Sequence, residues 1–298
     1  MSRITVISPG FRTTVQDLGR FGYQSIGVPP SGALDRDALE TANLLVGNAG
    51  GEACLECIMT GPELRCAKPL AFAVCGAPMG LRLNGAPVPM YETLHAEAGD
   101  LISLGGAEAG LCAYIAFAGG LAVEAVLGSR STYLPAGFGG WQGRALAAGD
   151  VLPLNEPSGR PGCRPVRHRF VPVEGQPSYP AEIVVRALRS HEASRFETGS
   201  VSRFFSEPYR VSPKSDRMGC RLEGGVLKHI RGADILSSGV QTGTVQVPGD
   251  GLPIVLLADR QTTGGYTRIA HVIQADLPRL GQVRTGDTVR FVETTLEA

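Results

Sequence analysis

The stretch Met59-Thr-Gly-Pro-Glu-Leu64 returns in altered form as Gln241-Thr-Gly-Thr-Val-Gln246, and this repetition points to a fold built from two similar halves. Two further pairs of segments keep the same order along the chain: residues 31–35 with 215–219, and residues 74–103 with 257–290. Each pair is separated by roughly 180 residues, and three pairs in order are hard to attribute to chance. We therefore predict two related domains in tandem.

Short runs of apolar and β-branched residues recur between Gly, Pro and Asp. They cover residues 4–7, 71–74, 101–104, 113–118, 182–187, 254–258 and 288–292. Such spacing is typical of sandwiches and barrels. Helical periodicity is clear only in residues 33–46, where Gly47 ends the run, and two more short helices are predicted near residues 192–196 and 269–280. The prediction is a mainly β protein with two tandem β-barrels and a few short helices.

The boundary between the two domains is predicted from composition. The segment from Asn155 to Pro180 contains six prolines and few apolar residues, which is typical of a linker. We therefore predict an N-terminal domain over residues 1–155, a linker over 156–180 and a C-terminal domain over 181–298.

Bulk properties narrow the class of protein. Lys plus Arg and Asp plus Glu each number 28, which removes the electrostatic case for binding nucleic acid or an anionic membrane. The apolar run at 111–128 contains Gly119-Gly120 and Glu124, so a buried strand and turn is predicted there instead of a membrane helix. Seven Cys without a regular framework, and a start that lacks a secretory leader, predict reduced thiols and a cytoplasmic location.

Two polar loops near the N-terminus are the first candidate site. The first carries Gln16, Asp17 and Arg20, and the second carries Ser31 and Asp35. Amide, carboxylate and guanidinium groups within five residues can both donate to and accept from one planar amide or carboxylate. The alternative is a structural turn held by an Asp–Arg pair, with Ser31 or Asp35 capping the next helix. Composition alone favours that alternative.

The C-terminal half holds the second candidate site. Lys214, Asp216 and Arg217 lie on one loop that composition alone would assign to solvent. An apolar strand then runs into a dense polar cluster, which is more often a site than a turn. The candidate ligand-binding residues around this strand are Gln241, Gln246, Asp259, Gln261, Thr262, Thr263 and Tyr266.

Several signals of cofactor chemistry are missing from the sequence. Cys54-x-x-Cys57 has no second pair or His at metal-ligand spacing, so buried structural cysteines are predicted and no metal. Neither a phosphate-binding Gly-x-x-x-x-Gly-Lys-Ser/Thr motif nor a Gly-x-Ser-x-Gly elbow occurs. If the chain belongs to an enzyme, we expect a partner to supply part of the catalytic machinery.

Several motifs in order resemble one family. They are Thr14-Val-Gln-Asp-Leu-Gly-Arg20, Pro30-Ser-Gly-Ala-Leu-Asp35, Gly128-Ser-Arg-Ser-Thr-Tyr133, Ser215-Asp-Arg-Met-Gly219 and Asp259-Arg-Gln-Thr-Thr-Gly-Gly-Tyr266. The chain is similar to the biotin-dependent carboxyltransferase family, which includes the C subunit of 5-oxoprolinase, the antagonist of the Kip kinase inhibitor, and the carboxyltransferase region of urea carboxylase. Two positions depart from the family pattern: Ser238-Gly239, where a pair such as Glu-Pro is more frequent, and Arg268, where Lys is common.

The resemblance implies a fold of two cyclophilin-like β-barrels. It also implies a role as the C subunit of an ATP-dependent 5-oxoprolinase, working with a Kip-inhibitor-like B subunit and a third, A-type subunit to open the lactam of 5-oxoproline to glutamate. ATP would be used by the complex, and no cofactor would be bound covalently to this chain. One alternative is a carboxyltransferase that acts on urea or a related amide, with biotin carried by a partner because the chain lacks Met-Lys-Met. The others are a non-catalytic regulator that binds a Kip-type inhibitor and a ligand-binding barrel without turnover.

Residue types suggest roles for a small lactam substrate. We expect Arg20 or Arg217 to bind the substrate carboxylate, and Gln16, Gln241 or Gln261 to pair with the lactam edge. Asp17 or Asp259 would accept a proton or orient an arginine. This hypothesis requires loops from distant parts of the chain to meet in one cleft.

Overall fold

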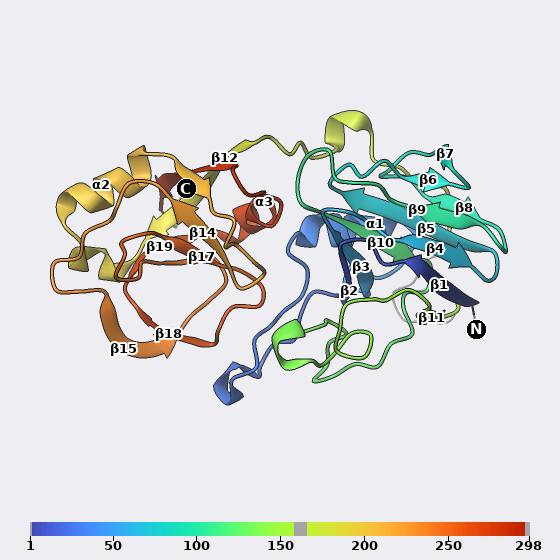
Figure 1. Cartoon of the computed structure of the whole chain (residues 1–298), viewed down its shortest axis with the longest axis horizontal. Helices are drawn as coiled ribbons and strands as arrows, with labels where there is room; N and C mark the ends of the chain where they lie inside the picture. Colours follow the sequence, from blue (N-terminus) through green and yellow to red (C-terminus); the bar gives the residue numbers. More distant parts are fainter. Residues whose placement is uncertain (1, 158–165, 296–298) are drawn as a thin grey trace. The chain divides into compact units, whose positions relative to one another are not determined.

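The computed structural model describes residues 2–157 and 166–295 and is mainly β (Figure 1). It divides into two compact units: Met1–Arg20 with Ser31–Tyr179, and Phe21–Pro30 with Pro180–Ala298. This division differs in two places from the predicted linear boundaries. Phe21–Pro30 groups with the C-terminal half, where the side-chain amide of Gln24 donates to the Val240 carbonyl at 3.5 Å.

The second difference concerns the predicted linker, residues 156–180, of which 158–165 lie outside the described residues. Its later part belongs to the N-terminal unit. The backbone N–H of Thr93 donates to the Arg169 carbonyl at 2.8 Å, and the hydroxyls of Tyr91 and Tyr179 lie 2.9 Å apart. Proline content predicts an irregular backbone, but it does not reveal which surface that backbone covers.

The N-terminal unit consists of two antiparallel sheets. The six-stranded sheet has the order β11-β1-β4-β9-β6-β7, and the five-stranded sheet has the order β2-β3-β10-β5-β8. The bounds are β1 Ser2–Ser8, β2 Arg12–Gln16, β3 Cys54–Ile58, β4 Glu63–Cys66, β5 Leu70–Gly76, β6 Arg82–Leu83, β7 Ala86–Pro87, β8 Leu94–Ala96, β9 Leu101–Ser103, β10 Cys112–Phe117 and β11 Val151–Leu154. The residues predicted as a buried strand and turn contain β10, all of whose side chains are buried.

A hydrophobic core fills the space between these sheets. It includes Ile4, Leu55, Leu64, Phe72 and Ile115, all fully buried. Helix α1, Arg36–Leu45, packs Ala38, Leu39 and Ala42 inward and contacts β5 and β10. The unit also contains the short 3-10 helices η2 Leu134–Ala136 and η3 Val173–Gly175. Strand β2 and helix α1 thereby position the segments around Asp17 and Asp35 in this unit.

The C-terminal unit contains a closed seven-stranded barrel with the order β12-β19-β16-β17-β14-β13-β20. Its strands are β12 Glu182–Arg189, β13 Tyr209–Val211, β14 Gly219–Glu223, β16 Thr244–Gln246, β17 Ile254–Leu256, β19 Arg268–Val272 and β20 Thr288–Thr294. Strands β12 and β20 pair in parallel, and the other pairs are antiparallel. A separate two-stranded ribbon joins β15 Asp234–Gly239 to β18 Thr263–Tyr266.

Helices and turns complete this unit: η1 Gln24–Ile26, η4 His191–Arg195, α2 Thr198–Ser206, η5 Gln274–Asp276 and α3 Leu277–Leu280. Phe204 of α2 stacks on Phe291 of β20 with ring centroids 4.4 Å apart. The mainly β prediction is confirmed, as are the strands predicted in both halves. The helix predicted at residues 269–280 is wrong in its first part, because Arg268–Val272 forms a barrel strand. No helix in the described part of the chain is long and apolar enough to cross a membrane.

Candidate functional site

Asp17 lies just beyond β2 at the centre of a hydrogen-bond network. Its Oδ1 accepts from the hydroxyls of Ser129 at 2.6 Å and Ser131 at 2.5 Å, and from the Gly19 N–H at 2.8 Å. Its Oδ2 accepts from the Arg130 N–H at 2.5 Å. These four donors fix the turn after β2 against residues 129–131. The structure therefore gives Asp17 a structural role, and its predicted role as a proton acceptor stays a prediction.

Arg20 is only 1% exposed and also joins the same two loops. Its Nη2 donates to the Ser131 carbonyl at 2.5 Å and its Nε to the Val126 carbonyl at 3.4 Å. The guanidinium lies over the Phe138 ring, 4.8 Å from the centroid, where a cation–π contact is favourable. These contacts favour the structural alternative for Arg20 over the predicted binding of a substrate carboxylate.

Gln16, the last residue of β2, is fully buried. Its Nε2 donates to Thr14 Oγ1 at 3.1 Å and to the Thr132 carbonyl at 3.2 Å, so the amide is fixed in orientation. Its Oε1 has no hydrogen-bond partner among the described residues. A buried acceptor without a donor is costly, which makes Gln16 a credible contact for an N–H of a ligand.

Ser31 and Asp35 behave differently within one short segment. Asp35 caps α1, because its Oδ1 accepts from the Ala38 N–H at 3.0 Å, as the structural alternative predicted. Ser31 adopts a left-handed backbone conformation with φ of 53°, which is unfavourable for a residue with a side chain. Its buried hydroxyl finds no hydrogen-bond partner in the described ranges. Strain together with an unsatisfied hydroxyl favours a functional role for Ser31.

In the C-terminal unit, Arg217 and Asp259 form a buried ion pair. Arg217 Nε lies 2.8 Å from Asp259 Oδ2, and Nη2 lies 3.1 Å from Oδ1. The two side chains are 4% and 2% exposed. The Asp259 N–H also donates to the Arg217 carbonyl at 2.9 Å. This fork geometry assigns Asp259 the second of its two predicted roles, the orientation of an arginine.

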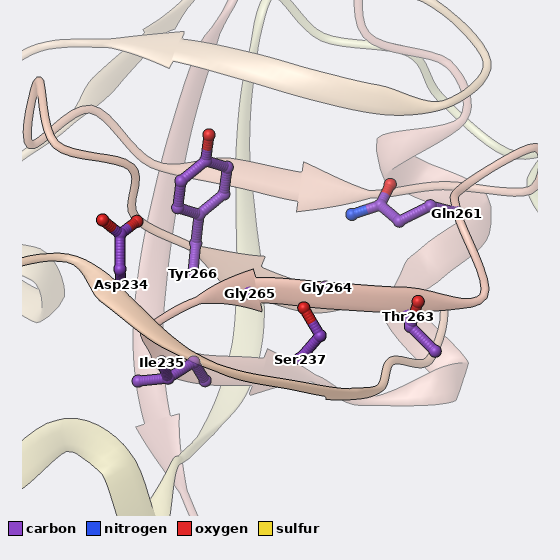
Figure 2. Close-up of a pocket in the computed structure, with 8 residues that line it drawn as sticks. All are labelled: Asp234, Ile235, Ser237, Gln261, Thr263, Gly264, Gly265 and Tyr266. Atoms are coloured by element: carbon purple, nitrogen blue, oxygen red, sulfur yellow. The ribbon is translucent and has the colours of Figure 1, made fainter.

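A shallow pocket of about 470 Å³ lies along the β15–β18 ribbon (Figure 2). Its lining comprises Asp234, Ile235, Ser237, Gln261, Thr263, Gly264, Gly265 and Tyr266. Three of these were predicted as ligand-binding residues: Gln261, Thr263 and Tyr266. In Figure 2 the amide of Gln261 points along β18 in the direction of Tyr266. The pocket is therefore lined by an amide, a carboxylate, hydroxyls and the backbone of two glycines.

Gln246 is buried and contacts Gln261, one of the residues that line this pocket. Gln261 Nε2 donates to Gln246 Oε1 at 3.0 Å, which leaves the Gln246 Nε2 as a buried donor with no hydrogen-bond partner in the part of the chain described. A Cβ at Gly264 would lie 2.3 Å from that Nε2, so the Gln246 amide would have to move. The structure thus brings four predicted residues together in one place: Gln246, Gln261, Thr263 and Tyr266.

Gln241 and Thr262, which were also predicted to bind a ligand, support the adjoining turn. The Gln241 N–H donates to Thr244 Oγ1 at 3.2 Å, and the Thr262 carbonyl accepts from the Val240 N–H at 3.1 Å. Their main chains therefore have clear structural roles. Binding of a ligand by their side chains stays a prediction.

Arg268 was noted only as a departure from the family pattern, yet it contacts the other departure. Its Nη2 donates to the Ser238 hydroxyl, and its Nη1 lies 3.8 Å from Glu192 Oε1. The Gly264 carbonyl is 3.5 Å from Nη2, which places this arginine beside the pocket. The two departures therefore form one contact. Burial and the Arg268 charge lower the pKa of His271, whose Nδ1 lies 3.2 Å from Thr244 Oγ1.

Arg260 was not among the predicted site residues, although it lies within one of the family motifs. It is 3% exposed, and burial lowers its pKa from the usual value. Its Nε and Nη1 have no hydrogen-bond partner among residues 2–157 and 166–295. Its position next to Gln261 was the sequence signal that could have identified it as a site residue. The residue type alone does not reveal whether a charged side chain has a hydrogen-bond partner in the fold. In the same ranges, no three His, Cys, Asp or Glu side chains gather in a way that could hold a metal ion.

Comparisons with known proteins agree on one family. The model of the carboxyltransferase domain, subdomain A and B, matches residues 26–293. The chain is 38% identical to the C subunit of 5-oxoprolinase from Escherichia coli and 37% identical to that from Haemophilus influenzae, in both cases over 99% of this chain and 92% of the relative. It also superposes on the crystal structure of K. lactis urea amidolyase with a TM-score of 0.93 at 32% identity. That match covers 98% of this chain but only 19% of the urea amidolyase chain.

Proposed function

The chain belongs to the family of carboxyltransferase domains with subdomains A and B, and on this premise we propose that it acts as the C subunit of an ATP-dependent 5-oxoprolinase. The observation that carries the proposal is the similarity, over nearly the full length of both chains, to two proteins of that name. The reaction opens the lactam of 5-oxoproline to give glutamate. Amide resonance makes the lactam carbonyl a poor electrophile, so ATP hydrolysis by the complex would supply the activation.

The pocket along β15 and β18 supports binding of a small planar amide. A lactam presents one N–H donor and one carbonyl acceptor on adjacent atoms. Gln261 and Gln246 each carry an amide with an N–H donor and an oxygen acceptor. The Gln246 Nε2 is already oriented, because the Oε1 of the same amide accepts from Gln261 at 3.0 Å. A donor that is buried without a partner favours the ligand that satisfies it. We assign the lactam carbonyl to the Gln246 Nε2.

The chain would act together with other proteins. We expect a Kip-inhibitor-like B subunit and a third, A-type subunit, because the relatives are themselves named as a subunit of 5-oxoprolinase. ATP would be used by the complex as a whole. The predicted location of this complex is the cytoplasm.

Reconstitution tests the proposal. The purified chain is mixed with its two partner subunits, 5-oxoproline and ATP, and glutamate and ADP are measured, with each protein omitted in turn. We expect both products from the full set and none when this chain is left out. Stoichiometric glutamate from the two partners alone would exclude a catalytic contribution of this chain and favour the regulator that binds a Kip-type inhibitor.

A second candidate is a carboxyltransferase that acts on urea or a related amide. The TM-score of 0.93 and the 32% identity to urea amidolyase favour it. Carboxybiotin would have to arrive on a partner. The same purified chain, supplied with a biotinylated carrier, a biotin carboxylase, bicarbonate, ATP and urea, distinguishes the two: carboxylated urea would support the second candidate, and glutamate from 5-oxoproline the first.

A further inference from the structure

Four arginines in the described residues are buried, and one of them stands apart. Arg20, Arg217 and Arg268 each contact protein acceptors: backbone carbonyls for the first, and Asp259 and Glu192 for the other two. Arg260 is buried to the same degree, at 3% exposed. Its Nε and Nη1 are both inaccessible to solvent, and neither has a hydrogen-bond partner among the described residues. Arg260 is thus a cation without a counter-ion in the part of the chain that the structure describes.

An unpaired buried cation is unfavourable in a folded protein. Arginine does not lose its proton at any physiological pH, so it cannot neutralise itself as a buried lysine or carboxyl group can. Burial removes the hydration of the guanidinium, and without an anion no ion pair offsets this desolvation cost. Folded proteins retain such groups where an anionic ligand pairs with them, because a binding site for an anion remains energetically unfavourable until the anion is bound.

The carboxylate nearest in the chain cannot neutralise Arg260. Both oxygens of Asp259 are engaged by Arg217, at 2.8 and 3.1 Å. The backbone turn that carries Arg260 is fixed by its own N–H, which donates to the Leu257 carbonyl at 3.3 Å. The next residue, Gln261, lines the pocket along β15 and β18. An unpaired cation therefore directly precedes, in the chain, an amide group that lines the proposed substrate pocket.

We propose that Arg260 binds the carboxylate of a small acidic amide substrate and thereby selects an acid over a neutral amide. This inference rests on the proposed function and deepens it, because 5-oxoproline carries a carboxylate on the carbon next to its lactam nitrogen whereas urea carries none. It also replaces the predicted assignment of the carboxylate to Arg20 or Arg217, both of which have protein partners. Arg260 is then the residue that makes the site favour 5-oxoproline over urea.

Substrate selectivity in the reconstituted complex tests the inference. Arg260→Met and Arg260→Lys are compared with Arg221→Gln, which removes an exposed arginine of β14. We expect Arg260→Met to raise the KM for 5-oxoproline by about 10- to 100-fold, the loss of one charge-assisted contact. The KM for 2-pyrrolidinone, a lactam without a carboxylate, should not change, and Arg260→Lys should recover part of the effect. An unchanged KM for 5-oxoproline in Arg260→Met would overturn the inference.

A binding measurement separates this inference from the proposed function. The thermal midpoint of the full chain is recorded with increasing 5-oxoproline or acetate, without partners or ATP. We expect both anions to raise the midpoint of the wild-type chain but not that of Arg260→Met, whose midpoint without ligand should be higher because the unpaired charge is gone. Absence of glutamate formation by the wild-type complex would reject the oxoprolinase proposal alone. An equal response of wild type and Arg260→Met to the anions would reject the role of Arg260.

Discussion

The loops around Asp17 and around Arg260 look alike in the sequence but differ in how their charges are satisfied. Asp17 accepts four hydrogen bonds, from two hydroxyls and two backbone N–H groups. Arg260 is also buried, and it has no hydrogen-bond partner for its Nε or Nη1 among the described residues. Both are charged residues on a polar loop that follows a strand. The first loop is stabilised by its charge, and the second is destabilised until a ligand binds.

The comparison gives a rule for interpreting polar clusters. A fully hydrogen-bonded carboxylate contributes to the fold, so its removal should reduce stability first and activity as a consequence. A buried group without a partner contributes to binding, so its removal should reduce affinity and leave or increase stability. Four further experiments test stability or binding, in order of expected effect.

The largest effect is expected for Asp17→Ala. Four donors lose their acceptor, and unsatisfied buried donors cost about 1–3 kcal/mol each, so we expect a loss on the order of 5 kcal/mol in the free energy of unfolding. Urea unfolding followed by circular dichroism measures it, with the exposed Glu124→Ala as a control. A loss below about 1 kcal/mol would show that Asp17 is not a structural centre.

The second prediction concerns the buried pair. Arg217→Ala leaves Asp259 buried without its cation, and we expect a loss of about 3–5 kcal/mol. The double variant Arg217→Met with Asp259→Leu should recover most of that loss, because no unpaired charge remains. Equal losses in the single and double variants would contradict the ion-pair interpretation. Arg260→Met also removes a buried positive charge, but one that pairs with no carboxylate of residues 2–157 and 166–295, so it should show no loss of stability.

The third prediction concerns the pocket. Gly264→Ala places a methyl group against the Gln246 amide. We expect the KM for 5-oxoproline to rise about tenfold, equivalent to about 1.4 kcal/mol, while the thermal midpoint changes little. Gly249→Ala serves as the matched control, because a Cβ there meets nothing within 4 Å. An unchanged KM would remove the Gln246 amide from the substrate site.

The smallest effect is a pH dependence. Arg144 donates to both oxygens of Asp150, each at 2.7 Å, and lowers the pKa of Asp150 to about 2. Because the folded pKa is below the unfolded one, this stabilisation is present above about pH 4 and is lost as the pH falls toward about 2. Urea unfolding should therefore show a difference between wild type and Asp150→Asn at about pH 6 that shrinks below about pH 4. A constant difference would rule out this titration.

Much of the fold was predictable because strand propensity and turn chemistry are local. The predicted strand at residues 113–118 is β10, and the predicted helix near residues 33–46 is α1, which begins at Arg36 after the Asp35 cap. The failures have a common cause. Residues 269–272 carry apolar spacing compatible with a helix, but they become β19 because the barrel provides strands on both sides of them. Likewise, Thr198–Ser206 was not predicted as a helix, and its packing through Phe204 stabilises it.

The candidate site was predictable by residue type and only partly by role. The cluster from Asp259 to Tyr266 was identified from its composition, and part of it does line a pocket together with β15. Whether loops of the two units share one cleft stays a prediction. The roles of Asp17, Arg20 and Asp35 were ambiguous in the sequence, because the same side chain can cap a turn or bind a substrate.

The sequence by itself determined the mainly β class, the order of the strands along the chain, the family and the set of polar residues available for chemistry. Only the tertiary structure decided which of those residues have hydrogen-bond or ion-pair partners within the protein. Hydrogen-bond partners such as Ser129 and Ser131 lie more than a hundred positions from Asp17 in the chain. Whether a charged side chain has a partner depends on distances in space, and the free energy of a buried charge depends on whether it has one. No local sequence pattern could therefore distinguish Arg217 from Arg260.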